Sequence, residues 1–312
     1  MAILVTGAAG LVGRAAVAAL LRQGVEHVRA VVREPAQVGD LRRLGAKVAL
    51  LDATDPDGLA AAMDGVFTAC TLTGSLWSRA LEDPSAAVVD PAQVFLAAAK
   101  AAGVRRVVVC SPAAVATPGA AGNAHLAAKA EVERMVAASG LEHAILRCAH
   151  VLGPGGRLLG LLAAGAAGPG QPSGAPGREP ALVPGDGRQR VAPVWVGDVA
   201  DAIATADDAA ELSAVTWSVA GPTQLTFDEL VDAVHGGRVA KRHLGTGVGA
   251  THGAAPPRGA GLSDVQVGVL AADSLGDPAL PAPPGQVPAP LAETLARAAG
   301  RERAGLPGRL DG

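Results

Sequence analysis

Three polar residues at four-residue spacing define a helical face on which acid–base chemistry could occur. His125, Lys129 and Glu133 recur at every fourth position of an Ala-rich segment, so on a helix they share one face. An imidazole titrates near neutral pH and can deliver or remove a proton, which makes His125 the leading candidate for a general acid or base. The alternative is an exposed helix that carries an ordinary histidine and a Lys–Glu pair.

Two further candidate catalytic residues follow strand-like segments. Ser111 comes directly after segment 106–110, and His150 comes shortly after segment 144–147. Open α/β sheets bind ligands beyond the carboxyl ends of their parallel strands, so both side chains are candidates for contact with a substrate. Both residues could instead have local structural roles. Serine often ends a strand because its hydroxyl hydrogen-bonds to the nearby backbone, and His150 could cap the Gly–Pro loop that begins at Gly153.

A glycine-rich loop joins the first strand-like segment, 3–6, to the first helical segment, 11–21. Glycines at this place permit a tight turn, a close approach of the backbone to a pyrophosphate, and close packing of the helix on the strand. The start of the helix also offers free N–H groups to an anion. We therefore predict a dinucleotide-binding loop, whose contacts are Gly7, Ala9, Gly10, Leu11, Val12 and Gly13.

The residue at the end of the second strand favours NADP(H) as the cofactor. A carboxylate there would bind the ribose hydroxyls of NAD, whereas Arg33 offers a permanently charged fork suited to the extra phosphate of NADP. A surface arginine is the alternative. Asp52 and Ala53 could reach the adenine edge, although Asp52 could equally cap a helix before Pro56. Thr71 and Thr73, at the end of the fourth strand, complete the predicted cofactor contacts.

Strand-like and helix-like segments alternate up to about residue 150, a pattern typical of βαβ units and a parallel sheet with helices on both faces. We predict an α/β fold: a Rossmann-type doubly wound parallel sheet with a smaller C-terminal substrate-binding part. The predicted strands are 3–6, 28–32, 47–51, 66–71, 106–110 and 144–147. The predicted helices are 11–21, 37–44, 58–63, 91–101 and 124–138.

The composition changes after Leu152, where a stretch rich in Gly, Pro and Ala begins. We therefore divide the chain into a cofactor-binding domain, 1–152, and a smaller substrate-binding part, 153–312. In the second part we expect strands at 191–196 and 215–219 and helices at 158–164, 199–206, 226–234 and 291–299. Asp198 is expected to cap the helix that follows it, and part of 245–290 is expected to be poorly ordered.

The composition argues against several functional classes. The net charge is −3 and the basic residues are scattered, which disfavours nucleic acid as a partner. No apolar run is long enough to span a membrane, and no leader-like segment opens the sequence, so we expect a cytoplasmic protein, monomeric or homodimeric. The three cysteines lack metal-ligand spacing, so no metal is expected.

Several motifs together resemble the atypical short-chain dehydrogenase/reductase family, NmrA-like branch. The motifs are the three glycines of the loop, the Val-Arg-Glu-Pro after the second strand, and segments 101–108, 129–133, 139–147 and 194–201. The resemblance implies that Lys129 reaches the cofactor ribose. It also implies a Ser or Thr after the fifth strand and a Tyr four residues before the lysine. Here His125 holds the tyrosine position, the chain contains no Tyr, and the family serine aligns with either Ser111 or Pro112.

Three functions are compatible with these features. The first is an NADP(H)-dependent oxidoreductase that acts on a small organic carbonyl or enone-like substrate. The second is a non-redox isomerase, dehydratase or cyclase on the same fold, which the missing tyrosine favours. The third is a non-catalytic NADP-sensing regulator of the NmrA-like kind.

Overall fold

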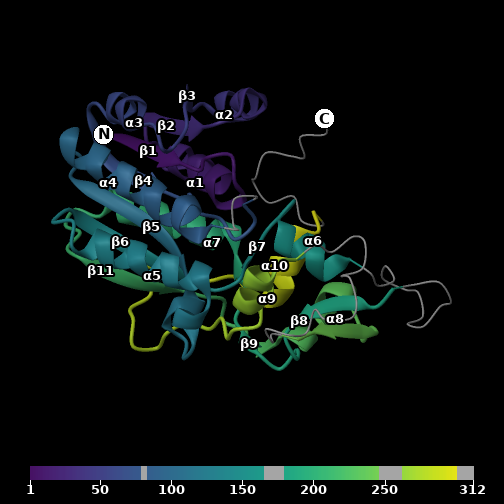
Figure 1. Ribbon diagram of the computed structural model, residues 1–312. Coiled ribbons are helices and arrows are strands. Elements are labelled where there is room, and N and C mark those ends of the chain that lie inside the picture. The colour runs from purple at the N-terminus through teal and green to yellow at the C-terminus, as the bar shows by residue number, and fades with distance from the viewer. Residues whose placement is uncertain (79–82, 165–178, 246–261, 301–312) are drawn as a thin grey trace.

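The computed structural model describes residues 1–78, 83–164, 179–245 and 262–300 (Figure 1). Its centre is a seven-stranded parallel sheet with the order β11-β6-β5-β4-β1-β2-β3. The direction of winding reverses between β1 and β4, the position where doubly wound sheets bind ligands. The strands are β1 (Ala2–Thr6), β2 (His27–Val32), β3 (Lys47–Leu50), β4 (Val66–Thr71), β5 (Arg106–Pro112), β6 (Glu142–Cys148) and β11 (Val215–Val219).

Helices cover both faces of this sheet. On one face lie α1 (Leu11–Arg22), α2 (Val38–Leu44) and α7 (Val196–Asp208), and on the other lie α3 (Pro56–Ala62), α4 (Asp90–Ala101) and α5 (Ala124–Ala137). Because both faces are covered, the inner strands are apolar along their length, and all five residues of β1 are buried. The predicted fold class is thereby confirmed.

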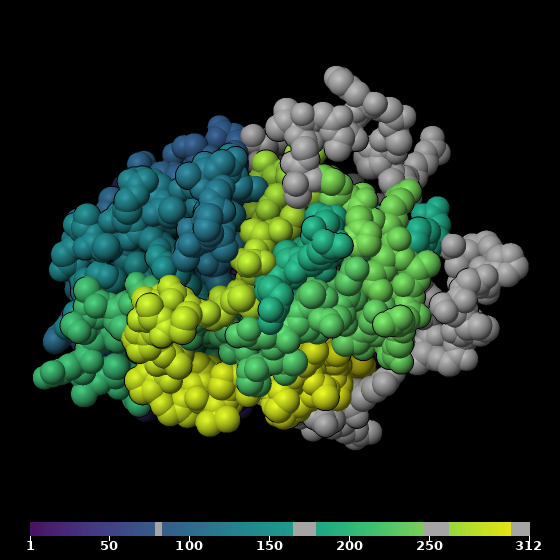
Figure 2. Space-filling model, turned by 90° about the horizontal axis from the view of Figure 1, so that it is seen from below, coloured from purple at the N-terminus to yellow at the C-terminus, as the bar shows by residue number. Residues whose placement is uncertain are grey.

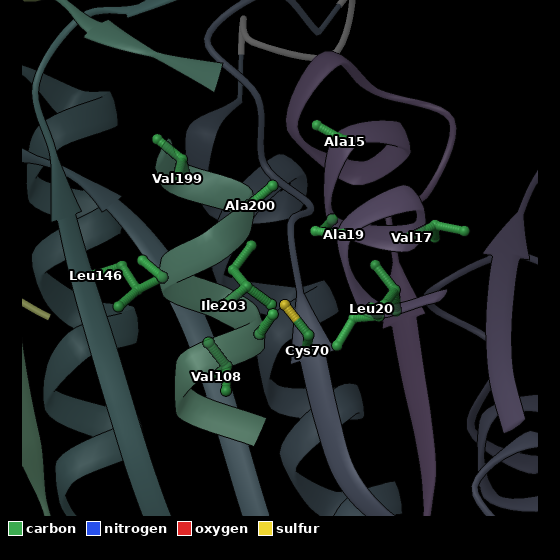
Figure 3. Packing of buried hydrophobic residues seen from close by; sticks show 14 of the residues in the cluster. Ala15, Val17, Ala19, Leu20, Cys70, Val108, Leu146, Val199, Ala200 and Ile203 are labelled. Carbon is green, nitrogen blue, oxygen red and sulfur yellow. The ribbon is translucent and has the colours of Figure 1, made fainter. Parts of the chain in front are cut away.

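Small side chains let α1 and α7 pack closely side by side. Ala15 and Ala19 of α1 face Ala200 and Ile203 of α7 above the sheet (Figure 3). Alanines allow the two helix backbones to approach each other, and the branched residues fill the remaining space. This packing fixes the helix whose N-terminus begins at the glycine-rich loop.

The rest of the chain forms short paired strands and four helices around a second apolar core. The strand pairs are β7 (Val151–Leu152) with β10 (Val194–Trp195), β8 (Ala181–Pro184) with β13 (Lys241–Leu244), and β9 (Arg190–Val191) with β12 (Leu225–Thr226). The helices are α6 (Arg157–Ala163), α8 (Phe227–His235), α9 (Asp264–Leu270) and α10 (Leu291–Ala298). Figure 2 shows residues 262–300, in yellow, against both the blue and teal first half of the chain and the green middle part.

The structure corrects the predicted boundary at residue 152. β11 pairs with β6 at the edge of the central sheet, and α7 packs on that sheet, so residues 196–219 build the first part although they follow the boundary. The predicted strand 191–196 is also wrong as a single element, because it forms the two short strands β9 and β10.

The expected N-cap role of Asp198 is wrong, since α7 begins at Val196 with Trp195 at the N-cap. The Asp198 carboxylate instead accepts a hydrogen bond from the backbone N–H of Ala289 at 2.9 Å.

Other expectations for the second half have mixed outcomes. The helix at 226–234 is confirmed as α8, with a capping box between Thr226 and Glu229. Helix α9 was not predicted, and it lies within the stretch expected to be poorly ordered. Residues 165–178 and 246–261, on which parts of the loop predictions fall, lie outside the described residues. No helix among the described residues is long and apolar enough to cross a membrane.

Candidate active site

The glycine-rich loop has the geometry that its sequence predicts. Gly7 has φ +68°, and a Cβ there would lie 2.8 Å from the carbonyl oxygen of Leu72. A Cβ at Gly13 would lie 2.3 Å from the carbonyl oxygen of Gly7, inside any permitted contact. Only glycine fits at these two positions, because the backbone after β4 lies against Gly7 and the first turn of α1, at Gly13, rests directly on the loop.

The loop ends at the start of a twelve-residue helix, which gives it the properties of an anion site. Gly10 is the N-cap of α1, and its N–H donates to the carbonyl oxygen of Gly7 at 3.0 Å. The N–H groups of the first helical turn have no partners within the helix, and the helix dipole favours negative charge at this end. The cradle therefore fits a dinucleotide pyrophosphate, and the individual contacts of Ala9, Leu11 and Val12 with it stay predictions.

Arg33 and Asp52 lie near each other at the ends of β2 and β3. The Arg33 side chain is 74% exposed and has a long contact of 3.9 Å with Glu34. Hydrogen bonds from the backbone and side chain of Thr54 lower the pKa of Asp52, and the charge of Arg33 adds to this effect. Asp52 does not cap the following helix, because Asp55 is the N-cap of α3. Arg33 is therefore an available cation at the edge of the site.

A chain of threonine hydroxyls leads from the loop toward the middle of the site. Thr6 Oγ1 and Thr71 Oγ1 are 3.0 Å apart, and Thr71 Oγ1 and Thr73 Oγ1 are again 3.0 Å apart. Thr6 and Thr71 are buried at the ends of β1 and β4, and Thr73 is half-buried. The hydroxyls fix the backbone that follows β4, which is the same backbone that approaches Gly7.

Lys129 reaches this backbone from the other side of the site. Its Nζ donates a hydrogen bond to the carbonyl oxygen of Thr73 at 3.0 Å, and it lies 3.2 Å from where a Cβ of Gly74 would be. Only 8% of Lys129 is exposed, and burial lowers the pKa of its amine to about 8. The fold thus brings α5 to the glycine-rich loop although the two are more than a hundred residues apart.

The face formed by His125, Lys129 and Glu133 is buried, so the exposed-helix alternative is wrong. The Lys–Glu pair of that alternative does not form either. The Glu133 carboxylate accepts from Arg147 of β6, with Nη2 to Oε2 at 2.7 Å. Lys129 is therefore free of a direct carboxylate partner among the described residues, and its ammonium group points to the Thr73 carbonyl.

His125 is held in the first turn of α5 with its ring buried. The residue is 1% exposed, and burial, followed by the charge of Lys129, lowers its pKa to about 4. Nδ1 is buried and has no hydrogen-bond partner within the described part of the chain. The imidazole is therefore neutral near pH 7 and can offer a hydrogen bond, but it is a weak proton donor.

Ser111 faces the same helix. Side chains alternate along a strand, and Val107 and Val109 pack in the cluster that contains Ala128 and Val132 of α5, so Ser111 points to that side. Its Oγ is buried, with no partner in the ranges that the structure describes. The structure thus places Ser111 on the side of the sheet that carries His125 and Lys129.

His150 lies elsewhere, against the C-terminal part. Its ring makes an edge contact with Phe227, with centroids 6.0 Å apart and an interplanar angle of 85°. Burial lowers its pKa to about 4, and Nε2 has no hydrogen-bond partner among the residues described. His150 therefore stays a candidate for substrate contact, and its Nε2 does not cap the loop that begins at Gly153.

Asn123 is a residue of the site that the sequence interpretation missed. Its Oδ1 accepts from the N–H groups of His125 and Leu126, at 3.1 and 3.2 Å, which makes it the N-cap of α5. An asparagine directly before an Ala-rich helical segment was the available signal. In the described ranges no cluster of His, Cys, Asp or Glu could hold a metal ion.

Comparisons with known proteins agree with this geometry. A family model described as NAD(P)H-binding matches residues 7–168. Because the match covers about half of the chain, the chain belongs to this NAD(P)H-binding family, and the resemblance to the NmrA-like branch of the atypical short-chain dehydrogenase/reductases is confirmed. No curated protein sequence matches the chain significantly.

Solved structures share the fold at low sequence identity. The NADPH-dependent quinone oxidoreductase of Escherichia coli, complexed with NADPH, is 23% identical, with a TM-score of 0.70 and coverage of 94% of this chain and 98% of that one. The triphenylmethane reductase of Citrobacter sp., complexed with NADP(H), is 19% identical, with a TM-score of 0.69 and coverage of 96% and 100%. The UDP-glucuronic acid 4-epimerase of Bacillus cereus, in complex with NAD, is 19% identical, with a TM-score of 0.62 and coverage of 78% and 86%. The chain is thus an NAD(P)H-binding protein with an oxidoreductase-type fold.

Proposed function

We propose that the protein is an NADP(H)-dependent reductase of small conjugated carbonyl compounds, such as enones or quinones. The observation that carries this proposal is the position of Lys129, a buried cation bound to the Thr73 carbonyl beside the glycine-rich loop. A buried lysine without a carboxylate partner is costly, and such groups cluster at functional sites. Arg33 supports NADP(H) over NAD(H), because it offers an available guanidinium at the end of β2.

Each side chain of the site then has a defined task. Bound NADPH would supply a hydride. Lys129 keeps its charge near pH 7 and orients the cofactor ribose, as the family resemblance implies. Ser111 and His125 lie on the same side of the sheet, where they donate hydrogen bonds to the substrate oxygen, and His150 contacts the substrate from the C-terminal part.

The neutral state of His125 narrows the substrate class. A simple ketone needs a proton at its oxygen as the hydride arrives, and neither a neutral imidazole nor a serine hydroxyl is a strong acid. A conjugated acceptor spreads the added electron pair over several atoms, so a hydrogen bond at oxygen is sufficient and water then supplies the proton. The lack of a tyrosine is therefore compatible with reduction of an enone or quinone.

The cofactor part of the proposal is tested by titration of the purified protein with NADPH, NADP⁺ and NADH at matched ionic strength. We expect tighter binding of the phosphorylated cofactors, and we expect Arg33→Ala to remove that preference by weakening NADPH alone. Arg22→Ala, which removes an exposed arginine at the far end of α1, is the control for net charge. Equal affinity of the wild type for NADPH and NADH would contradict the assignment of Arg33.

The chemical part is tested by the decrease of NADPH absorbance with a quinone, an enone and a saturated ketone. We expect turnover of the first two and little of the third. The unpartnered ring nitrogens of His125 and His150 also favour a second candidate, a non-redox isomerase, dehydratase or cyclase that retains its nucleotide. Cofactor binding without NADPH consumption for any acceptor would favour that candidate over the reductase.

A further inference from the structure

Helix α9 of the C-terminal part lies directly on the residues that shape the active site. It packs on α5 on one side and on β8 on the other, between the two parts of the molecule (Figure 1). Val269 contributes to a small apolar cluster with Leu126 and Ala114, next to His125. Gln266 Nε2 donates to the carbonyl oxygen of Leu76 at 3.0 Å, in the segment that follows Thr73.

Asn123 is the polar link between this helix and α5. While its Oδ1 caps α5, its Nδ2 donates to the carbonyl oxygen of Val265 in α9 at 3.0 Å. Gly268 makes room for it, because a Cβ at that position would lie 2.6 Å from Asn123 Nδ2. One side chain thus joins the first turn of α5, which carries His125, to an element more than 140 residues later in the chain.

We propose that Asn123 is a positioning residue, which holds the imidazole of His125 in place by tying the first turn of α5 to α9. The expected effect on turnover rests on the proposed reductase function. The effect of Asn123 on the position of His125 does not depend on that function. Capping alone needs only an acceptor at position 123, and serine or aspartate would supply one. The Asn123 amide also supplies an N–H donor, which serine and aspartate side chains lack. The close approach of Gly268 shows that α9 is shaped to receive this amide.

Two substitutions break the tie from opposite sides. Asn123→Ser keeps the cap but is too short to reach Val265. Gly268→Ala leaves Asn123 intact but pushes its amide away from α9. Inside a helix, alanine is normally at least as favourable as glycine. If the contact with Asn123 had no role, Gly268→Ala would therefore cause no loss of activity. Gly160→Ala in α6, where a Cβ meets nothing within 4 Å, is the matched control.

The first readout is steady-state kinetics with NADPH and the best acceptor. We expect both variants to lower kcat by roughly tenfold to 100-fold, as displaced catalytic groups do, with the Kd for NADPH unchanged. Gly160→Ala should leave both constants unchanged. Wild-type kcat in both Asn123→Ser and Gly268→Ala would overturn the proposal.

The second readout does not require turnover. The ring C–H signal of His125 is assigned by its loss in His125→Gln and followed in NMR spectra of the full chain as a function of pH. We expect both variants to shift this signal and to move its titration midpoint toward the ordinary range of histidine, whereas Gly160→Ala leaves it in place. If the wild type reduces no acceptor, the reductase proposal fails, but a shifted His125 signal still supports the positioning role and an unchanged signal refutes it.

Discussion

Replacing Lys129 by methionine tests whether the buried, charged amine at the site lowers the free energy of unfolding. The amine has a pKa of about 8 in the folded protein, against 10.5 for an ordinary lysine. A difference of about 2.5 pH units corresponds to about 3 kcal/mol, since each unit is about 1.4 kcal/mol. The folded protein releases this proton more readily than the unfolded chain does, so the charged amine destabilises the fold fully below about pH 8.

The cost decreases as the pH rises from about 8 to about 10.5, because the folded protein loses the charge first. From about pH 7 to about pH 9.5 the cost falls from about 3 to about 1 kcal/mol, so the wild type should gain about 2 kcal/mol relative to Lys129→Met. The lost hydrogen bond to Thr73 offsets part of the advantage of the variant at every pH. The slope with pH is therefore the diagnostic quantity.

Urea unfolding of the wild type and Lys129→Met across this pH range measures the slope. Lys100→Met is the control, because Lys100 is exposed at the end of α4 and its replacement should give a difference that is flat with pH. A flat difference for Lys129→Met as well would show that the amine is hydrated in the folded protein. The assignment of Lys129 as a buried cation at the site would then be wrong.

Two further predictions concern the scaffold. Gly13→Ala would place a Cβ 2.3 Å from the carbonyl oxygen of Gly7, so we expect the Kd for NADPH to rise about 100-fold or more, equivalent to about 3 kcal/mol, in a titration where Gly10→Ala has a smaller effect. Arg106, buried under the end of α7, donates to the carbonyl oxygens of Ala206, Asp207 and Ala209. Arg106→Met should lower the free energy of unfolding by about 3 to 5 kcal/mol, measured in urea, because it leaves these carbonyls without partners. An unchanged urea midpoint would show that water reaches the end of α7.

Local sequence patterns predicted most of the central sheet. The strand at 66–71 and the one at 215–219 match β4 and β11 residue for residue. β4 is a mostly buried inner strand of largely apolar residues, and β11 is a short edge strand that alternates apolar and hydroxyl residues. The glycine-rich loop was equally predictable, since its steric requirements act between neighbours in the sequence. In both cases the signal and its physical cause lie within a few residues of each other.

Long-range pairing was not predictable in this way. Nothing in segment 215–219 indicates that it joins β6 rather than a separate sheet, because any apolar strand can pair with any other. Likewise, the spacing of His125, Lys129 and Glu133 predicted a shared face but not its burial, and the partner of Glu133 turned out to be Arg147 on another strand. Helix α9 was missed because seven residues in a Gly- and Pro-rich stretch give too little periodicity to detect.

Several features that cost stability lie together at one edge of the sheet, and this grouping is an argument for function. The left-handed glycine at position 7, the desolvated amine of Lys129, and the unpartnered polar atoms of Ser111 and His125 lie at the carboxyl ends of the strands or on the helix that covers them. The buried guanidinium of Arg106, at the amino end of β5, is largely compensated, because its two terminal nitrogens make four hydrogen bonds while only Nε has no partner among the described residues. Buried polar atoms without partners also occur away from this edge, at Thr68 and Gln189, but in the described part of the chain only here do they lie beside a desolvated amine and a dinucleotide-binding loop, as expected where a ligand binds. A dinucleotide bound at the glycine-rich loop with a substrate beside His125, as proposed above, would lie against all of these groups.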